Sequence, residues 1–296
     1  MIVLRLSGGL GNQMFEYAMA RHLALRNHTR LKLDLTFLRR RNTSMRHTPR
    51  EYTLDMFVLE PNFFSPLERA LFKLGLTRLK RHHESEFQIK PGHTVAFNPD
   101  VLTLPDNSYL EGFFPSPCYF LGIEEVIRRE FVFRTPPAGA ALEMQRQITD
   151  TESVCVHVRR GDYVTNPSAN QTHGLCPLSY YSAAFARLQE RGVRTPRLFV
   201  FSDDILWCRE NLKLDAPTTY VDPEYAGEKD GDHFKLMTSC KHFIIPNSSF
   251  SWWPAWLSAA TPAKVVVAPK IWTRRDIGLE PIPLGWETIE TELIGG

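Results

Sequence analysis

The chain has 296 residues, of which 43% are hydrophobic and 23% are charged, and its formal net charge at pH 7 is +2. The composition is ordinary for a soluble globular protein, the length suits two α/β lobes, and the charge says little about partners. No apolar run is long enough to span a bilayer, which excludes a membrane-spanning helix.

The five cysteines are widely spaced and odd in number, and they include no CxxC pair. This pattern argues against a disulfide framework or a zinc site. The amino terminus is typical of a strand and not of a signal peptide. We therefore expect a protein of the reducing cytoplasm.

The first landmark is a strand, a glycine turn and a helix. Ile2–Leu6 predicts the strand, Ser7–Gly11 the loop, and Asn12 the N-cap of an amphipathic helix. Glycines let the backbone approach a ligand, and a helix amino terminus favours an anion. The glycine spacing fits neither a dinucleotide fingerprint nor a Walker loop, so neither nicotinamide nor ATP chemistry is indicated.

A strand at Leu31–Leu35 precedes an arginine-rich segment, Arg39–Arg50, which contains no acidic residue. One interpretation is binding of nucleic acid or of lipopolysaccharide phosphate. We favour a solvated basic loop and no nucleic-acid partner, because no base-stacking aromatic residues are interleaved with these arginines.

The remainder of the first half predicts three helices, at Leu67–Arg81, Cys118–Phe131 and Ala141–Asp150. Between the first two helices, Tyr109–Phe114 predicts a strand that leads into an aromatic turn. A proline- and glycine-containing stretch between Phe133 and Glu152 marks the lobe boundary. We predict a first lobe at 1–150, a second lobe at 151–270, and a tail at 271–296 that packs back on the first lobe.

The stretch around Arg159 is the centre of the sequence. Val154–Val158 predicts a strand buried on both faces, and Arg159 and Arg160 follow it directly. Parallel sheets bind ligands at the carboxyl ends of their strands, and two adjacent guanidiniums are costly unless an anion neutralises them. The sequence therefore predicts a phosphate-bearing ligand. The alternative is that Arg160 pairs with Asp162 and Arg159 with another carboxylate.

The next strand ends in a second polar cluster. A polar segment, Thr165–Cys176, predicts a functional loop with His173 near its centre, and Pro177–Arg191 predicts a helix. The strand Leu198–Phe201 ends in three polar residues, Ser202, Asp203 and Asp204. These residues could bind a divalent metal, bind a base and ribose, or cap the following helix.

A third strand end follows at His242–Ile245. Ser248 and Ser249 open a helix there, and their hydroxyls and amides would cradle a phosphate from the side opposite the arginines. Lys264–Ala268 predicts the last strand. Three strand ends of the second lobe thus offer hydrogen-bond donors to an anion or nucleoside, and the first lobe begins with a glycine loop. Two Rossmann-like lobes with a ligand between them are the architecture of GT-B glycosyltransferases.

Four motifs make the resemblance specific. The chain resembles glycosyltransferase family eleven, the α-1,2-fucosyltransferases, in GGLGNQMFEYAMA (8–20), HVRRGDY (157–163), FSDD (201–204) and SCKHFIIPNSSFSWWPAWL (239–257). The resemblance implies an α/β fold of GT-B type with two Rossmann-like lobes facing a cleft, an acceptor-side lobe first and a GDP-fucose-binding lobe second. It implies transfer of L-fucose from GDP-β-L-fucose, with inversion and without a required metal, to the 2-hydroxyl of a terminal β-galactoside in glycan or O-antigen synthesis.

The resemblance also implies roles for individual residues. Arg159 would hold the β-phosphate and stabilise charge on the departing GDP. Strand periodicity places His157 on the same face, where it would reach the ribose or the same phosphate. The other donor-binding residues are Asn12 across the cleft, Arg160, Ser202, Asp203 and Asp204 at the nucleoside end, and Ser248, Ser249 and Phe250 at the diphosphate.

The general base is open between Asp162, His173 and Glu111. Asp162 beside two arginines should be a poor base, because their charge favours the carboxylate form. The usual pKa of histidine suits His173 better. The alternative for His173 is a loop residue that only orders its surroundings.

Two residues depart from the family pattern. His233 occupies the position where family members usually carry the aspartate that reads guanine, and Asp232 precedes it. Either Asp232 serves after a one-residue shift, or backbone groups read guanine. Pro254 replaces the usual glycine after the tryptophan pair, which the first turn of a helix tolerates.

Two alternatives to the main hypothesis remain at this point. HxRRxD also occurs in α-1,6- and protein O-fucosyltransferases, so another linkage or a protein acceptor is one alternative. A non-catalytic nucleotide-sugar or polyanion-binding protein is the other. We expect GDP-fucose and a galactose-terminated oligosaccharide as partners, and at most peripheral association with the inner membrane.

Overall fold

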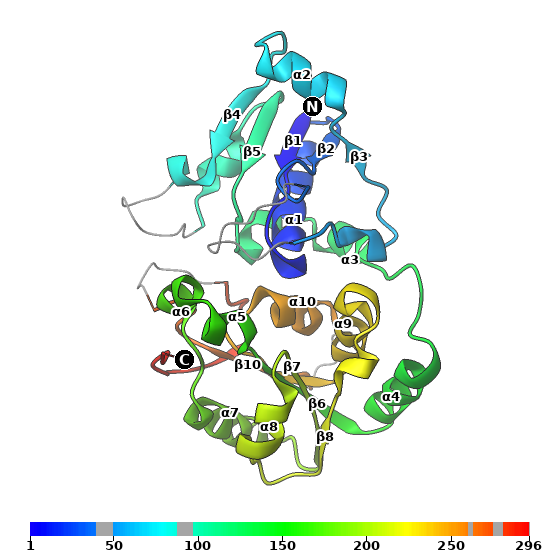
Figure 1. Cartoon of the computed structure of the whole chain (residues 1–296), viewed down its shortest axis with the longest axis vertical. Helices are drawn as coiled ribbons and strands as arrows, with labels where there is room; N and C mark the ends of the chain where they lie inside the picture. The colour runs from blue at the N-terminus through cyan, green and yellow to red at the C-terminus, as the bar shows by residue number, and fades with distance from the viewer. Residues whose placement is uncertain (40–49, 88–96, 260–262, 275–280, 296) are drawn as a thin grey trace. The chain divides into compact units, whose positions relative to one another are not determined.

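The structure is a computed structural model and describes residues 1–39, 50–87, 97–259, 263–274 and 281–295. The chain divides into two compact units (Figure 1), mainly Met1–Arg134 for the first and Thr135–Asp276 with Ile282–Gly296 for the second. Each unit is built on a parallel sheet with helices packed against it. Most of the arginine-rich segment Arg39–Arg50 lies outside the described residues.

The first unit contains a parallel sheet with the strand order β3-β2-β1-β5-β4. Its described strands are β1 Ile2–Arg5, β2 Leu31–Asp34, β3 Asn62–Phe63, β4 Lys80–His83 and β5 Ser108–Glu111. Its described helices are α1 Leu10–Arg26, α2 Pro66–Lys73 and α3 Glu124–Glu130, with 3-10 turns η1 Leu54–Met56, η2 Glu84–Phe87, η3 Pro99–Thr103 and η4 Pro117–Phe120.

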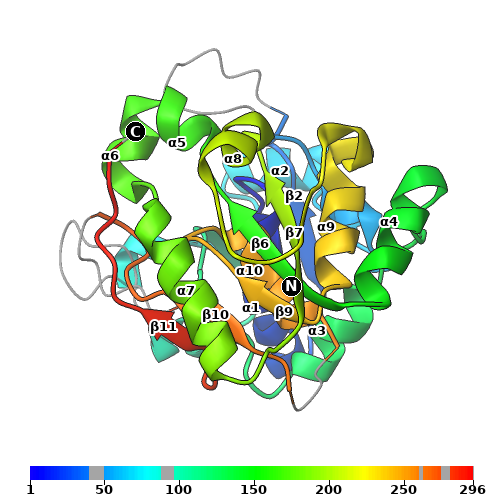
Figure 2. The same cartoon turned by 90° about the horizontal axis from the view of Figure 1, so that it is seen from below.

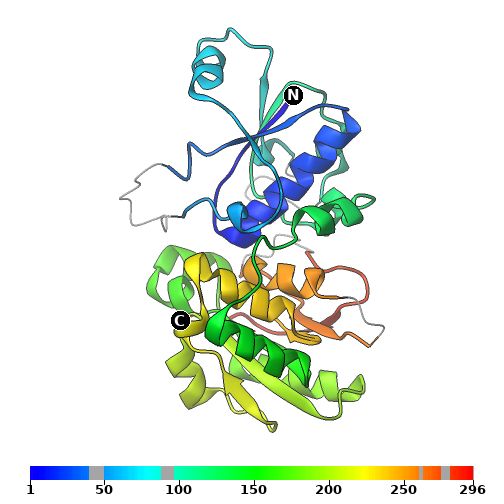
Figure 3. The same cartoon turned by 90° about the vertical axis from the view of Figure 1, so that its right-hand side faces the viewer.

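The predicted strand, glycine turn and helix at the amino terminus are confirmed. Ile2, Val3 and Leu4 are fully buried in β1, and α1, blue in Figure 3, packs against this strand. The N-cap of α1 is Gly9, because the amide of Gln13 donates to the Gly9 carbonyl. Asn12 is therefore inside the first helical turn and does not cap it.

The predicted helix Leu67–Arg81 is wrong in its second half. The helix α2 ends at Lys73, Gly75 takes a positive φ of +70°, and the chain then forms β4. Lys80 pairs in register with Ser108, so parallel pairing with β5 outweighs the helical propensity of this segment. The predicted helix Cys118–Phe131 is likewise two elements, η4 and α3, separated by Gly122 at φ +87°.

The second unit contains a parallel sheet with the strand order β11-β10-β9-β6-β7-β8. Its described strands are β6 Glu152–Val158, β7 Pro196–Ser202, β8 Thr218–Tyr220, β9 His242–Ile244, β10 Val266–Pro269 and β11 Glu287–Ile289. Its described helices are α4 Gly139–Thr149, α5 Gly161–Thr165, α6 Pro167–His173, α7 Leu178–Glu190, α8 Ile205–Asn211, α9 Gly231–Thr238 and α10 Ser249–Leu257, with 3-10 turns η5 Pro223–Tyr225 and η6 Glu228–Asp230.

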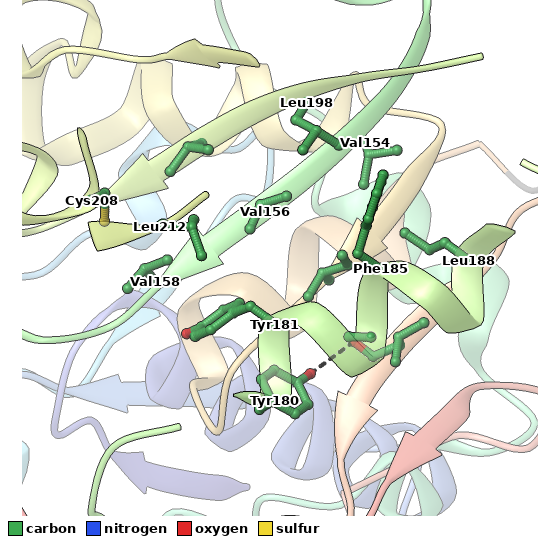
Figure 4. Close-up of a cluster of buried hydrophobic side chains, with 14 of the residues drawn as sticks. Val154, Val156, Val158, Tyr180, Tyr181, Phe185, Leu188, Leu198, Cys208 and Leu212 are labelled. Atoms are coloured by element: carbon green, nitrogen blue, oxygen red, sulfur yellow. Dashed lines mark hydrogen bonds between the residues drawn. The ribbon is translucent and has the colours of Figure 1, made fainter. Parts of the chain in front are cut away.

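The strand β6 is buried on both faces, as its continuous apolar run predicts. Val154, Val156 and Val158 face a cluster that includes Tyr181 and Phe185 of α7 (Figure 4). Residues of the opposite parity, such as His157, face the side of α9 and α10 instead. Figure 2 accordingly shows α7 on one side of the strands and α4 and α9 on the other.

The strand order of each sheet reverses at one place among the described strands. In the second sheet the chain moves outward from β6 to β7 and β8, then returns to the other side of β6 for β9, β10 and β11. In the first sheet the reversal lies between β1 and β5. Open α/β sheets bind ligands beyond the carboxyl ends of the strands at such positions. The loops after β6 and β9, and after β1 and β5, are therefore the expected binding loops.

Two other expectations for the second unit are corrected. The predicted loop Thr165–Cys176 is largely helical: Asn166 caps α6, Pro167 is its first residue, and Gly174 ends it at φ +66°.

The tail was expected to pack on the first lobe. Instead, Glu287–Ile289 forms β11 and pairs with β10, which gives the backbone groups on that side of β10 their partners, although the division of the chain assigns Ile277–Pro281 to the first unit.

None of the helices in the described part of the chain is both apolar enough and long enough for a membrane span.

Candidate functional site

The guanidinium of Arg159 is held by carboxylates on two sides at the carboxyl end of β6. Its Nη2 donates to Asp162 Oδ1 at 2.5 Å, and its Nη1 lies 2.8 Å from Asp203 Oδ2. Burial lowers the pKa of Arg159, but Asp203 and Asp162 outweigh this effect, so the pKa lies above its ordinary value. A guanidinium has five N–H groups, and these two contacts leave donors to spare for an anion.

Asp203 joins the ends of β6 and β7. Its Oδ1 accepts the backbone N–H of Arg160 at 2.8 Å, while its Oδ2 contacts Arg159. Gly161 permits this approach, because a Cβ there would lie 2.4 Å from Asp203 Oδ2. The glycine of the motif is therefore needed for a close contact and not for an unusual φ.

Arg160 turns toward β7 and away from Asp162. Its Nε donates to Asp204 Oδ2 at 3.0 Å, and its guanidinium lies 3.8 Å from the centre of the Trp207 ring. Asp204 Oδ1 also accepts the Trp207 amide and so caps α8, while Ser202 Oγ accepts the Asp204 amide. The alternative anticipated from the sequence is confirmed for Arg159, which pairs with another carboxylate, Asp203, but Arg160 pairs with Asp204, and Asp162 binds Arg159.

His173 lies beside Asp162 and Arg159. Its ring stacks on Tyr163 with 4.9 Å between centroids and 8° between planes. Burial lowers its pKa, Asp162 opposes this, and Arg159 adds to it, with a net shift downward. His173 is consequently a neutral imidazole at neutral pH, which is the protonation state that a base requires.

Asn247 and Tyr163 connect the loops after β6 and β9. The Tyr163 hydroxyl donates to the Asn247 carbonyl at 3.3 Å. The side-chain amide of Asn247 donates to the carbonyls of His173 at 3.0 Å and Trp272 at 3.1 Å. Sequence reasoning assigned no role to either residue, although both lie in the quoted motifs.

The helix α10 begins at the end of β9, next to β6. Ser248 is its N-cap, and the first intrahelical bond runs from the Trp252 amide to the Ser248 carbonyl. The amides of Ser249, Phe250 and Ser251 precede that bond and lie at the positive end of the helix dipole. This arrangement favours an anion at the reversal of strand order that Arg159 also borders.

His157 is a buried neutral residue under this site. Only 4% of its surface is exposed, its ring centroid lies 5.8 Å from that of Phe250, and burial lowers its pKa to about 3. Arg159 and His233 lower this pKa further. Among the described residues, Nδ1 of His157 has no hydrogen-bond partner. His157 can therefore contact a ligand only as a neutral group.

His233 and Asp232, the two candidates for the position that reads guanine, have side chains that face in different directions. His233 faces inward, with its Nε2 3.0 Å from the Asp222 carbonyl and its ring edge toward Phe201. Asp232 remains partly exposed and accepts a hydrogen bond from the buried Lys235 ammonium at 2.9 Å. Of the two, Asp232 keeps a carboxylate oriented toward the surface.

The reversal point of the first sheet is braced by two buried carboxylates that sequence reasoning missed. Glu16 accepts the Ser7 amide at 2.9 Å and the Ser7 hydroxyl at 2.5 Å, and burial raises its pKa well above the ordinary value. Glu84 accepts the amides of Phe113 at 2.8 Å and Phe114 at 3.0 Å. These bonds fix the loops after β1 and β5, and 42% of Phe113 remains exposed there.

Asn12 and Glu111 also belong to the first unit. The glycine turn lies against Asn12, because a Cβ at Gly8 would lie 2.7 Å from Asn12 Nδ2. Glu111 is buried in β5, 3.2 Å from Arg5 Nη2 and 3.5 Å from Arg81 Nε. This double ion pair favours a structural role for Glu111 in the sheet.

Asp203 and Asp204, the candidate metal ligands, are both occupied by arginines. The described residues include no group of three or more His, Cys, Asp or Glu arranged to hold a metal ion.

Comparison with known proteins extends these observations. Residues 1–276 match the profile of the family described as Glycosyl transferase family 11. An α-1,2-colitosyltransferase of Escherichia coli is 33% identical over 98% of this chain and 99% of that protein. The O-antigen biosynthesis glycosyltransferase WbnK of Escherichia coli is 30% identical over 90% of this chain and 93% of that protein.

A solved structure agrees with the fold. A mutant of FUT1 from Arabidopsis thaliana in complex with GDP has a TM-score of 0.50 at 13% identity, covering 93% of this chain and 72% of that chain. Together with the two parallel α/β units, this similarity confirms the predicted GT-B fold class.

The contact between Gly161 and Asp203 yields a test of the site's packing. We expect Gly161→Ala to lower the free energy of unfolding by about 1–3 kcal/mol, because the methyl group overpacks against the carboxylate. In the background of Asp203→Ala the same change should cost clearly less, since the obstructing atoms are gone. Urea denaturation of the four proteins measures both costs, and equal costs in the two backgrounds would contradict the contact.

Proposed function

The chain belongs to glycosyl transferase family 11, and on this premise we propose that it transfers L-fucose from GDP-β-L-fucose to the 2-hydroxyl of a terminal β-galactoside. The α-1,2 linkage in the name of the first relative supports the position of transfer. The name of the second relative supports a role in O-antigen synthesis. We further propose that the reaction inverts the anomeric carbon, needs no metal, and takes place in the cytoplasm.

The observation that carries the proposal is the position of Arg159. Its guanidinium lies at the reversal of strand order, is oriented by Asp162 and Asp203, and keeps N–H groups that these carboxylates do not use. The fucosyl bond breaks with oxocarbenium character, so negative charge gathers on the departing diphosphate. A fixed guanidinium beside that charge lowers the barrier without a metal ion.

The rest of the donor would follow the edge of the second sheet. The amino terminus of α10, with Ser248, Ser249 and Phe250, suits the diphosphate. The nucleoside would lie toward Ser202, Asp203 and Asp204, and Arg160 over Trp207 forms a flat surface there. Asp232, with its exposed carboxylate, is the better candidate of the two neighbours for reading guanine, since His233 faces the interior. His157 would contribute packing and a neutral contact.

The acceptor would bind at the carboxyl edge of the first sheet. The Ser7–Gly11 loop and Asn12 lie there, and the half-exposed Phe113 ring suits the apolar face of a pyranose. The buried carboxylates Glu16 and Glu84 would hold these loops in a single geometry.

Among the base candidates, His173 is our choice for deprotonating the galactose hydroxyl. Its pKa is lowered, so it is neutral and able to accept a proton at neutral pH. Asp162 is engaged by Arg159 and Glu111 by two arginines, which leaves both as structural partners.

A second donor is favoured by one observation, the 33% identity to a colitosyltransferase. Colitose is fucose without the hydroxyl at carbon 3, so the two donors present the same diphosphate and the same linkage chemistry. A site that hydrogen-bonds the extra hydroxyl would discriminate strongly against its absence, whereas an apolar site would not.

The whole proposal is tested by product analysis. With lactose as acceptor we expect GDP release from GDP-fucose and an α-1,2-fucosylated product by NMR, faster than from GDP-colitose. A reversed donor preference would assign the chain to colitosyl transfer. Another linkage, or transfer only to a protein, would assign it to another fucosyltransferase class. Binding without turnover of either donor would leave a nucleotide-sugar-binding protein.

Arg159→Ala should lower turnover by roughly 10²–10³-fold, the usual effect of removing one positioned electrostatic donor, about 3–4 kcal/mol. EDTA should leave the wild-type rate nearly unchanged. Arg146→Ala, which removes an exposed arginine paired with Glu143 on α4, is the matched control and should retain full activity. Strict dependence on magnesium would instead give Asp203 and Asp204 a metal role.

Substitution of the base should separate transfer from donor hydrolysis. We expect His173→Gln to lose transfer to lactose and keep slow hydrolysis of the donor, because the departure of GDP depends on Arg159, and bulk water can capture the oxocarbenium-like sugar without this base. The wild-type transfer rate should fall only as the pH drops below the usual 6.5 of histidine, since the pKa of His173 is lowered. Asp162→Asn and Glu111→Gln are assayed in parallel. If His173→Gln retains transfer, the variant of these two that loses transfer and keeps hydrolysis identifies the base.

A further inference from the structure

The helix α2 of the first unit exposes its apolar side. At helical spacing, Leu67, Ala70, Leu71 and Leu74 share one face, and Glu68, Arg69 and Phe72 share the opposite face. Surface helices normally bury such a leucine face and expose the charged one. Here 69% of Leu67 and 71% of Leu74 are exposed, and so is 68% of Leu76 just beyond the helix.

The opposite face of α2 is held against the sheet by specific contacts. Glu68 accepts from Lys32 Nζ at 2.5 Å, and Arg69 Nη2 donates to Asp34 Oδ1 at 3.0 Å. Phe72 stacks on Tyr109 with 4.8 Å between ring centroids. Ser65 and Glu68 form a capping box at the start of the helix. The orientation of α2 is therefore fixed by several bonds, and the leucines face outward as a consequence.

Exposed basic residues lie close to these leucines in the sequence. Lys73, Arg78 and Lys80 are exposed next to Leu74 and Leu76. Glu68 is the one acidic residue in the sequence from Phe64 to His83, and Lys32 neutralises it. In the described part of the chain none of the three basic residues has an acidic partner. We call Leu67, Leu74 and Leu76 with these three basic residues the leucine-basic face.

The leucine-basic face lies away from the proposed acceptor loops. The chain leaves α2 at Leu74 and enters β4 at Lys80, so the connection lies at the amino edge of the parallel sheet, near the N-terminus in Figure 1. The glycine loop after β1 and Phe113 after β5 lie at the carboxyl edge. Changes to this face should therefore leave the acceptor loops intact.

We propose that the leucine-basic face docks the protein on the surface of an anionic lipid bilayer. An interfacial helix needs leucines on one side to enter the acyl boundary and basic residues beside them to meet anionic headgroups, and this face supplies both. The net positive charge of these three basic residues is why we choose a bilayer over a second copy of the chain, since two such faces would repel each other when apposed. The proposal does not depend on which sugar the protein transfers.

Co-sedimentation of the full chain with vesicles tests the proposal. Vesicles of phosphatidylcholine with about one third phosphatidylglycerol should carry the protein down, and phosphatidylcholine alone should do so much less. Each basic residue near an anionic surface contributes about fivefold in partitioning, so Arg78→Gln with Lys80→Gln should lower it about 25-fold. Leu74→Ser with Leu76→Ser should lower it at least tenfold.

Matched controls carry the same changes elsewhere. Leu284→Ser removes a fully exposed leucine, and Arg194→Gln an exposed arginine, both in the second unit. These variants should bind vesicles like the wild type. GDP release with soluble lactose should be equal in all variants, which shows that they are folded and separates this test from that of the proposed function.

Three results would overturn the proposal. The first is a wild-type chain that stays in the supernatant with anionic vesicles. The second is equal loss of binding in the control variants. The third is a concentration-dependent dimer in sedimentation velocity that the leucine substitutions abolish while vesicle binding is unchanged, which would assign the face to self-association.

Discussion

The pairing of Arg159 with Asp203 is the interaction on which the second unit's site depends. It joins the ends of two neighbouring strands and requires the missing Cβ of Gly161. Together Arg159 and Arg160 face Asp162, Asp203 and Asp204, so the arginines are already neutralised before any ligand binds. An anion must then use the remaining N–H groups or exchange with a carboxylate. The benefit is preorganisation, because an arginine otherwise loses about 2 kcal/mol of side-chain entropy when it is fixed.

Both sheets place their distinctive loops where strand order reverses, but with different chemistry. In the second sheet the reversal offers a guanidinium and a helix amino terminus, which suit a phosphate. In the first it offers a glycine turn and an exposed ring, held by the buried carboxylates of Glu16 and Glu84. A cation also lies near the glycine turn, since the guanidinium carbon of Arg50 is 3.9 Å from the position of a Cβ at Gly9. Our proposal of a donor lobe and an acceptor lobe rests on the guanidinium and helix amino terminus of the second sheet and on the exposed Phe113 ring of the first.

Sequence reasoning predicted the elements that have a single strong determinant. The apolar run before Arg159 predicted β6 correctly, and the glycine turn predicted the helix α1, although this helix begins at Leu10 and not after the expected cap Asn12. It failed at Lys80–His83, where pairing with β5 outweighs helical propensity, and at Pro167–His173, where an Asn-Pro start and a glycine end are helix signals inside a polar segment. The tail was misplaced because nothing in Glu287–Ile289 indicates which sheet will pair with it.

By itself the sequence determined the family, the residue types at the strand ends and the expectation of a phosphate ligand, because these depend on local motifs and on their order. Only the tertiary structure decided which carboxylate meets which arginine, that His233 faces inward while Asp232 does not, and that the leucines of α2 face outward. These features arise from contacts between segments distant in the chain. Local periodicity carries no information about such partners, since the strand order that brings them together is set by packing of the whole sheet.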